Sequence, residues 1–536
     1  MVFTLHRYIF RELLKVFVPA ALALTVIMSL GSILRPVQEY GVGPRQVIHL
    51  MIYFLPITLT FVLPMAALFT GALVYGRFAG DNELDACRAS GISLSSLVYP
   101  GLTLAIVVAI CNLILSFYVM PVFVHLAEKS LKADAKQILF RNVQRRPYYK
   151  LPPDGRYLIY ADYADTQSDT LFGVVVTELK QGRIEKIITA QEAKVSFNPS
   201  DRFNEVRITA HKTDQMGSDD DVWFSAEQLS VATEFGALLG DDIKFKKIDE
   251  MKLIKSDLMQ FYPVARLARD TYAQLTTELL AQDIAARIAG DPNSFYRLHS
   301  GERLVEFTAN NVTVSERKIE LSGNIVVIES DAISKKRLCK LAAPGGKVLL
   351  YIEGDELAPT LTMDIYNARV EETGDLKMRY VVRGLILPEA VESVTNQFRT
   401  ESGELTVGKL AAKLSHLQKG PGPALKGLQG KLQRMMQKTL AQIAAEIHSR
   451  LVFGIGCVSM ILIGIGLGII KKGGHLLSAF GVSCVPAAVL IVCIMSGKQV
   501  TENISPRNVS GIVLMWAGLA LLTLIAAGIY HRLLRH

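Results

Sequence analysis

The sequence predicts a membrane protein of mixed α and β structure, with six transmembrane helices in two groups of three and a large jelly-roll-like β domain between helices three and four. Three observations lead to this fold class. Half of the 536 residues are hydrophobic whereas 20% are charged, six long stretches contain no Asp, Glu, Lys or Arg, and a more polar region separates the two groups of stretches. Such a composition is typical of a chain that lies partly in lipid and partly in water.

The six uncharged stretches are long enough to cross a bilayer, because a spanning helix needs about 20 apolar residues. They cover residues 16–34, 51–75, 97–119, 451–470, 476–497 and 509–530. Buried helices of soluble proteins have shorter apolar runs, so we predict six transmembrane helices. The first stretch is longer than the apolar core of a signal peptide and has no small-residue cleavage pattern, which favours a helix that is retained.

The basic residues that flank these stretches predict the orientation. With the N-terminus in the cytosol, nine of them lie in the inner flanks and four in the short outer loops. The inner set is Arg7, Arg11, Lys15, Arg77, Arg88, Lys471, Lys472, Arg532 and Arg535, and the outer set is Arg35, Arg45, Lys498 and Arg507. Because Lys and Arg are enriched on the cytosolic side, we predict cytosolic termini and a middle domain on the far side of the membrane. In a bacterium with two membranes, this places the chain in the inner membrane and the middle domain in the periplasm.

The middle domain, residues 121–445, lies between a first membrane domain at 1–120 and a second at 446–536. Its runs of Val, Ile, Tyr and Thr, many of them alternating with polar residues, predict strands. These strands cover residues 157–163, 171–179, 184–195, 205–211, 318–329, 347–353, 360–370 and 378–387, with turns predicted at 153–155, 217–219 and 344–346.

Helical periodicity predicts an insertion at about 256–289, and a Gly/Pro linker at 419–424 precedes a basic helix that leads into span four. The domain's single cysteine, Cys339, excludes a disulfide within it.

No arrangement of residues in the sequence indicates catalysis, a metal site or a bound cofactor. The ten histidines form no HExxH motif, and Leu410 stands where a phosphate loop beginning at Gly403 would need Ser or Thr. The spans also lack the carboxylates, Lys, Arg and His that ion-coupled carriers keep at mid-membrane depth. We therefore expect a protein that is not an enzyme and that draws any energy for transport from a partner.

The loop between spans two and three is the most informative short segment. It predicts a small helix at 83–89 within a segment of about 81–91, capped by Asp81 or Asn82 and stopped by Gly91. Composition alone leaves two interpretations open, a partner-binding helix on the cytosolic face and an ordinary interfacial loop.

At this loop the sequence resembles the coupling helix of the LptF/LptG (YjgP/YjgQ) permeases, the membrane subunits of an ABC transporter that extracts lipopolysaccharide from the inner membrane. The run Arg7-Tyr8-Ile9-Phe10-Arg11-Glu12-Leu13 is similar to the start of that family's span one, and Glu446-Ile447-His448-Ser449-Arg450-Leu451 to the start of its span four. The middle domain is larger than the family's usual single jelly roll, so the sequence leaves open whether it holds one β unit with an insertion or two.

The resemblance implies roles for particular residues. Glu83 would pair with an arginine in a groove of the cytosolic ATPase, and Asp81, Asp85 and Arg88 would line the same contact. Arg35 and Arg45, at the outer ends of spans one and two, would meet the phosphates of the lipid headgroup. Ordinary anchoring at the membrane surface is the alternative explanation of these two arginines.

The resemblance also implies the partners. They are a cytosolic ABC ATPase dimer that hydrolyses ATP, a second LptF/LptG-type permease, a periplasmic jelly-roll protein of the LptC/LptA type and lipopolysaccharide, with no nucleic acid. The sequence does not distinguish an LptF-type from an LptG-type chain. Two other classes remain open, a mechanotransmission-type ABC subunit that conducts no lipid and a membrane-anchored periplasmic scaffold.

Overall fold

The computed structural model divides the chain into two compact units, Met1–Ser256 with Lys438–His536, and Asp257–Gln437. It describes residues 2–40, 44–133, 135–145, 148–150, 157–165, 168–180, 183–199, 204–217, 223–235, 242–289, 294–301, 303–315, 317–334, 336–353, 358–400, 404–412, 420–470, 476–503 and 509–535.

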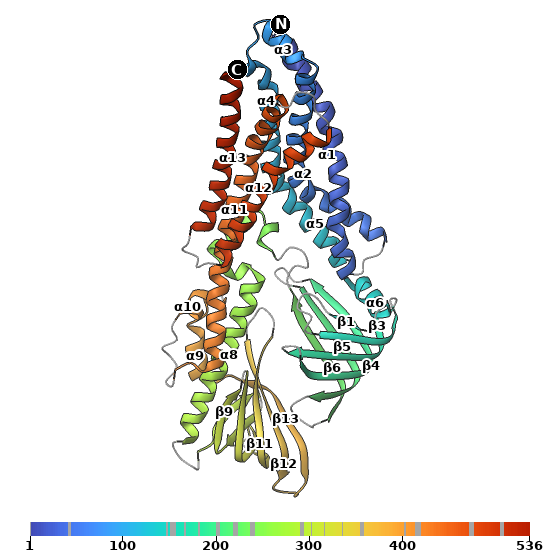
Figure 1. Ribbon diagram of the computed structural model, residues 1–536. Coiled ribbons are helices and arrows are strands. Elements are labelled where there is room, and N and C mark those ends of the chain that lie inside the picture. The colour runs from blue at the N-terminus through green and yellow to red at the C-terminus, as the bar shows by residue number, and fades with distance from the viewer. Residues whose placement is uncertain are drawn as a thin grey trace. The chain divides into compact units, whose positions relative to one another are not determined.

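Six helices of the described residues are long and apolar enough to cross a membrane, which confirms the predicted three-plus-three arrangement (Figure 1). They are α1 (Val2–Tyr40), α2 (Pro44–Gly80), the rod of α4 (Leu94–Ile114), η1 (Leu115–Val119) and α5 (Met120–Ala133), then α11 (Pro423–Ile470), α12 (Leu476–Asn503) and α13 (Ser510–Arg535). The long α11 begins directly after Gly422, with proline at its first position, where no backbone N–H is needed.

A buried side chain repairs the hydrogen bonding of α2 in the helix bundle. Pro64 has no N–H, so the carbonyl of Thr60 loses its helical donor. The Asn112 amide, which is 1% exposed, donates to that carbonyl at 2.9 Å. Since a bilayer supplies no water, the asparagine has a structural reason to lie within an apolar span.

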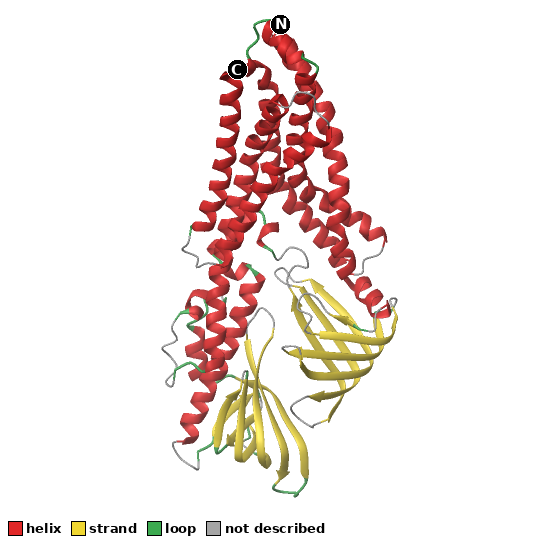
Figure 2. Cartoon of the chain, in the orientation of Figure 1, coloured by secondary structure: helices red, strands yellow, loops and turns green. Residues whose placement is uncertain are grey.

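In the part of the chain that separates the two groups of helices, the strands form two separate sheets (Figure 2). The first belongs to the same unit as the helix bundle and follows α6 (Ala135–Arg145). Its six strands pair in sequence order as an antiparallel meander: β1 (Tyr149–Lys150), β2 (Tyr157–Asp165), β3 (Thr170–Lys180), β4 (Arg183–Pro199), β5 (Asn204–Gly217) and β6 (Trp223–Phe235).

In the described parts of β2 to β5 one face of the meander stays buried, although strict alternation of side chains would not keep it so. In β4, Ala190 and Ala193 are both buried and the two residues between them are exposed. The neighbouring strands show the same pattern, in which two residues separate consecutive inward side chains. From β2 to β5 this step falls at corresponding positions of adjacent strands, marked by Asp162, Gly173, Gln191 and Lys212. The extra residue restores the inward side after a bend, as a β-bulge does, so the sheet curves around its apolar face. A Cβ at Gly173 would meet Asp162 Oδ2 at 2.0 Å, so this position requires glycine.

The second unit contains a closed barrel. Neighbouring strands follow the order β11-β12-β13-β7-β8-β10-β9, and β10 also pairs with β11, which closes a ring of β7, β8, β10, β11, β12 and β13. The bounds are β7 (Tyr296–Ser300), β8 (Arg303–Thr308), β9 (Asn311–Ser315), β10 (Lys318–Asp331), β11 (Arg337–Glu353), β12 (Ala358–Val370) and β13 (Leu376–Ile386). The first half of β10 pairs with β9 and the second half with β8.

Side chains fill this barrel. Val305, Phe307 and Leu361 are 0% exposed, as expected for a ring narrower than the eight-stranded barrels whose interiors side chains just fill. At one end Tyr380 donates to the Glu329 carboxylate, which Arg303 Nη1 also binds at 3.0 Å. Burial and the Glu329 carboxylate raise the pKa of Tyr380, so its hydroxyl remains a donor at this mouth.

The remaining helices follow the first sheet or flank the barrel in sequence. They are η2 (Ile243–Phe245) and α7 (Ile248–Ser256) in the first unit, and η3 (Leu258–Gln260), α8 (Tyr262–Ala289), α9 (Glu389–Asn396) and α10 (Val407–Ala411) in the second. The Glu278 carboxylate of α8 accepts the Gly422 N–H at 2.8 Å, next to the N-terminus of α11. A carboxylate at this position stabilises the helix through its dipole.

The predicted turn at Pro344-Gly345-Gly346 is wrong, because these residues lie inside β11. Pro344 falls in a bulge, with no ladder partner on β10 or β12, so its missing N–H removes no ladder hydrogen bond. The predicted turn at 153–155 and residues 218–219 of the turn at 217–219 lie outside the described residues.

Candidate functional site

The loop between α2 and α4 forms a short helix, α3 (Glu83–Ala89), over the residues for which the sequence predicted it. Figure 1 places α3 at the end of the helix bundle that also carries both chain termini. Gly91, with φ of +83°, follows the helix and donates its N–H to the Arg88 carbonyl at 2.9 Å. This left-handed glycine ends the helix, as the sequence predicted.

The predicted N-terminal cap of α3 is wrong in its chemistry. Asn82 occupies the capping position with φ of 59° and makes no side-chain capping hydrogen bond. A side-chain cap normally requires an extended backbone at this residue. The left-handed backbone of Asn82 instead forms the turn between α2 and α3, a conformation that asparagine tolerates better than most residues.

One apolar side chain anchors α3 to the bundle. Leu84 is 5% exposed and belongs to a buried cluster with Ile9 of α1, Phe78 of α2 and Leu97 of α4. Cys87, one turn further along, packs against the same cluster. The cluster thus connects α3 with three of the long helices, and a close-packed interior transmits strain.

The predicted coupling residues all lie on the solvent side of this anchor. Asp81, Glu83, Asp85 and Arg88 are exposed. Among the described residues, the Glu83 side chain makes no hydrogen bond or ion pair, so its carboxylate is available to a partner. The acidic Glu83 and Asp85 stand in the first turn and Arg88 in the last, an order that suits the helix dipole.

Sequence reasoning missed an ion pair beside α3. Arg77 Nη2, near the end of α2, donates to Glu12 Oε2 of α1 at 3.0 Å, and Lys15 Nζ binds Oε1 at 2.5 Å. The pair ties span one to the helix that leads into α3. Glu12 and Arg77 are 65 residues apart, so no local pattern joins them.

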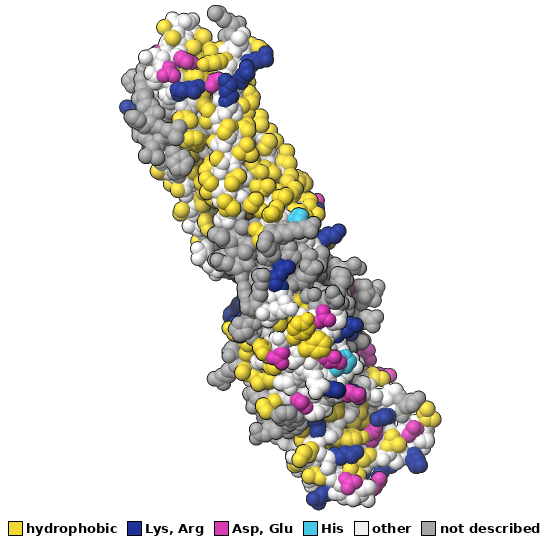
Figure 3. Space-filling view, turned by 90° about the vertical axis from the view of Figure 1, so that its right-hand side faces the viewer, with side chains coloured by type: hydrophobic (Ala, Val, Ile, Leu, Met, Phe, Trp, Pro, Cys, Tyr) yellow, Lys and Arg dark blue, Asp and Glu magenta, His cyan; other side chains and the backbone are white. Residues whose placement is uncertain are grey.

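The predicted headgroup residues are placed only by their helices. Arg35 lies in α1 and Arg45 in α2, and their side chains lie outside the described part of the structure. Figure 3 shows one face on which hydrophobic side chains cover the helix bundle. The exposed apolar residues of span one include Val18, Leu22 and Val26. The opposite stripe, with Ala20 and Leu24, packs against Val62 and Ala66 of α2.

In the part of the chain that the structure describes, six long apolar helices and an exposed acidic helix anchored in their core define a multi-pass membrane protein. The sequence profile described as "Lipopolysaccharide export system permease LptF/LptG" matches residues 7–281, just over half of the 536-residue chain. The chain therefore belongs to the LptF/LptG family, and this membership implies a role in lipopolysaccharide export. No curated protein matches the chain.

The match includes α3, the first sheet and most of α8, and it ends before the barrel strands begin. The barrel thus lies outside the part of the chain that carries the family likeness.

Proposed function

We propose that this chain is the transmembrane permease subunit of an ABC transporter that extracts lipopolysaccharide, or a related glycolipid, from the inner membrane. The observation that carries the proposal is the exposed Glu83 on a helix anchored by Leu84, in a member of this permease family. A separate cytosolic ATPase dimer hydrolyses ATP and binds α3. Both termini and α3 then lie in the cytosol, and the two β structures in the periplasm.

The contact with the ATPase follows from the chemistry of α3. A carboxylate binds an arginine by two parallel hydrogen bonds, and this geometry keeps its orientation while the partner moves. Glu83 makes the main contact in this proposal, with Asp81, Asp85 and Arg88 beside it. Leu84 then carries the movement of α3 into α1, α2 and α4.

A second LptF/LptG-type permease completes the lipid cavity. The uncovered stripe of span one (Val18, Leu22, Val26) and exposed residues of α12, Val485 and Val492, supply apolar surface for acyl chains or for the partner's helices. Arg35 and Arg45 bind headgroup phosphates at the outer ends of their spans. Nucleotide-driven closure of the two permeases would expel the lipid toward the periplasm.

The first sheet receives the lipid in this mechanism. Its buried face carries many small side chains, including Ala161, Ala190, Ala193 and Ala210, and curves at the two-residue step. Shielding acyl chains there avoids a cost of about 25 cal/mol for each Å² of apolar surface left in water. The free edge of β6 would accept a strand of a periplasmic jelly-roll protein of the LptC/LptA type.

The decisive experiment compares variants of α3 in the purified chain and counts the ATPase that co-purifies. Glu83→Gln removes the charge and is expected to weaken ATPase binding at least about tenfold, the value of one charged hydrogen bond. Glu83→Asp keeps the charge and is expected to retain part of the binding. Asp81→Asn is the matched control, with a smaller expected effect because Glu83 makes the main contact.

Two outcomes would reject the proposal. Normal co-purification of the ATPase with Glu83→Gln would remove the coupling role of α3, and absence of any ATPase from the wild-type preparation would favour a membrane-anchored scaffold. An ATPase partner without any lipid adduct, from photoreactive residues in span one or the first sheet, would instead favour a mechanotransmission subunit.

A further inference from the structure

After the first sheet the chain runs through residues 242–256, named here the return segment, which contacts the membrane helices before the chain enters the second unit. It comprises η2 and α7 and lies in the same unit as the helix bundle. Asp242 begins it by accepting the Lys244 N–H at 3.1 Å, which caps η2. Its Ile243, Met251 and Ile254 side chains are buried, and polar contacts add direction to this apolar packing.

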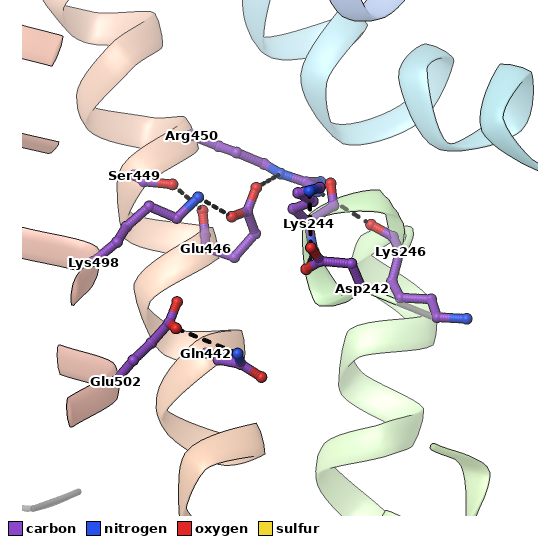
Figure 4. A network of polar contacts seen from close by, with 9 residues as sticks. All are labelled: Asp242, Lys244, Lys246, Gln442, Glu446, Ser449, Arg450, Lys498 and Glu502. Carbon is purple, nitrogen blue, oxygen red and sulfur yellow. Dashed lines mark hydrogen bonds and ion pairs between the residues drawn. The ribbon is translucent and has the colours of Figure 1, made fainter. Parts of the chain in front are cut away.

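A buried arginine of α11 binds this segment through its backbone. Arg450 Nη2 donates to the Lys244 carbonyl at 2.8 Å and to the Lys246 carbonyl at 3.3 Å (Figure 4). Arg450 Nε donates to Glu446 Oε1 at 2.9 Å, one turn earlier on the same helix. The other carboxylate oxygen of Glu446 accepts from Lys498 of α12. One side chain thus joins span four and the return segment, and its partner Glu446 extends the connection to span five.

Span three completes the arrangement. The guanidinium carbon of Arg450 lies 5.5 Å from the centroid of the Phe117 ring, within cation–π range. Phe117 belongs to η1, a π-helical turn between α4 and α5, and such turns reorient side chains within long helices. The π turn therefore helps to set the direction of the Phe117 ring within span three.

Burial makes the arrangement specific. The side chains of Arg450 and Glu446 are 3% and 8% exposed. A buried charge is tolerated only where it is paired and hydrogen-bonded, so the two charges hold one geometry. Lysine could pair with Glu446 but lacks the planar fork that reaches a carboxylate and two carbonyls together.

A second contact fixes the far part of the return segment. His125 Nε2 of α5 lies 3.0 Å from Glu250 Oε1 of α7, and Glu250 Oε2 accepts the Lys247 N–H at 3.0 Å. The backbone bond is the capping-box contact at the start of α7. The return segment is therefore held at two points, by span four at η2 and by the continuation of span three at the start of α7.

We infer that Arg450 is a positioning residue that fastens the return segment to spans three and four, so that the first sheet follows the movement of α11. The inference rests on the proposed function for its consequence, the passing of lipid to the sheet. Because Arg450 binds backbone carbonyls, the hold depends on the path of residues 244–246 and not on their side chains. Without the Arg450 contact, the spans would move while the first sheet kept its position.

The first test measures the hold itself and needs no transport. Spin labels replace Lys252 of α7, whose side chain is 71% exposed, and Ile455 of α11, 43% exposed, in a cysteine-free full-length chain. We expect a narrow distance distribution in the wild type and a broad one in Arg450→Lys. Gln442→Ala is the matched control, because Gln442 joins α11 to Glu502 of α12 but does not touch the return segment. Its distribution is expected to stay narrow.

The second test measures coupling in the assembled transporter. Arg450→Lys is expected to keep its ATPase rate while lipopolysaccharide released per ATP falls about tenfold, the effect of losing charged hydrogen bonds. A merely structural role would lower both quantities together. In the wild type, the distance between the two labels is expected to remain the same with and without trapped nucleotide.

An unchanged distribution in Arg450→Lys would overturn the inference, as would a wild-type distance that shifts with nucleotide. If Arg450→Lys does not fold, the wild-type nucleotide comparison still decides the question. Failure of the wild-type chain to release lipopolysaccharide would reject the proposed function and leave the distance result intact.

Discussion

The two β structures of this chain have similar numbers of strands, but only one of them closes into a ring. The first sheet has six strands in sequence order, and among the described residues its outer strands β1 and β6 each pair on one side only. The barrel joins β10 to β11 and β13 to β7, so its main ring has no free edge. The first sheet can accept a further strand or a ligand beside its apolar face. In the barrel, by contrast, the strands of the ring already pair with one another and side chains already fill the interior.

Under the proposed function, this contrast corresponds to a division of labour between the two β structures. A meander with an alanine-rich face and a bend suits a surface that takes up acyl chains. A ring filled by residues such as Phe307 and closed at one mouth by Glu329 and Tyr380 suits a rigid platform. The family likeness ends before the barrel strands, which agrees with a role for the barrel apart from lipid transfer.

The largest expected effect is the presence or absence of a lipid adduct. Benzoylphenylalanine in place of Tyr157, which packs at the margin of the apolar face of the first sheet, is expected to crosslink lipopolysaccharide in the working transporter. The same replacement of Tyr380, in the mouth of the barrel, is expected to give none. Adducts are detected by gel shift and antibody. A lipid adduct from Tyr380 would contradict the proposal that only the first sheet takes up lipid.

Cavity formation is the next largest effect and compares the two interiors directly. Leu361 of the barrel and Leu171 of the first sheet are both 0% exposed. Leu361→Ala is expected to destabilise its unit by about 4–5 kcal/mol, because the closed ring cannot collapse into the gap, and Leu171→Ala by about 2–3 kcal/mol. Hydrogen exchange of the full-length chain reports each region. Equal losses of protection would indicate that the first sheet is packed as rigidly as the barrel.

A buried ion pair on the barrel gives a smaller effect. Arg379 binds Asp364 with two nitrogens, at 2.6–3.0 Å, and the carboxylate is 2% exposed. Arg379→Met leaves a buried charge unpaired and is expected to cost about 2–3 kcal/mol, reduced because Arg379 is partly exposed. The control, Arg297→Met, removes the exposed partner of Glu306 and is expected to cost about 0–1 kcal/mol. Similar losses in thermal unfolding would contradict the structural difference.

The smallest effect concerns the return segment between the two β structures. Burial raises the pKa of the Glu250 carboxyl, but hydrogen bonds from His125 and the Lys247 N–H more than offset this and lower it below 4.5. A depressed folded pKa means that the stabilisation is present above pH 4.5 and is lost as the pH falls through the lower, folded pKa. Label distances at Lys252 should therefore broaden only at acid pH. Glu250→Gln should abolish this dependence.

Much of the fold could be predicted because its signals are local. The six spans follow from composition, and the helix at 83–89 from charged residues followed by a glycine. The strands at 157–163 and 171–179 were predicted within two residues of the observed β2 and β3. The turn at Pro344 failed because proline and glycine mark bulges as well as turns, and β6 to β9 were missed because their alternation is weak or short.

The candidate site divides in the same way. The sequence pointed to Glu83 through its local motif, and ATPase binding by Glu83 stays a prediction. The role of Leu84 as anchor and the pair of Glu12 with Arg77 required the packing of helices that are far apart in sequence.

The sequence by itself determined six helices that are long and apolar enough to cross a membrane, since a helix in lipid satisfies its own backbone hydrogen bonds and must carry apolar side chains. Only the tertiary structure decided that one β structure closes and the other stays open, and that Arg450 holds the return segment. Both depend on contacts between residues up to about 200 positions apart, for which no local pattern exists.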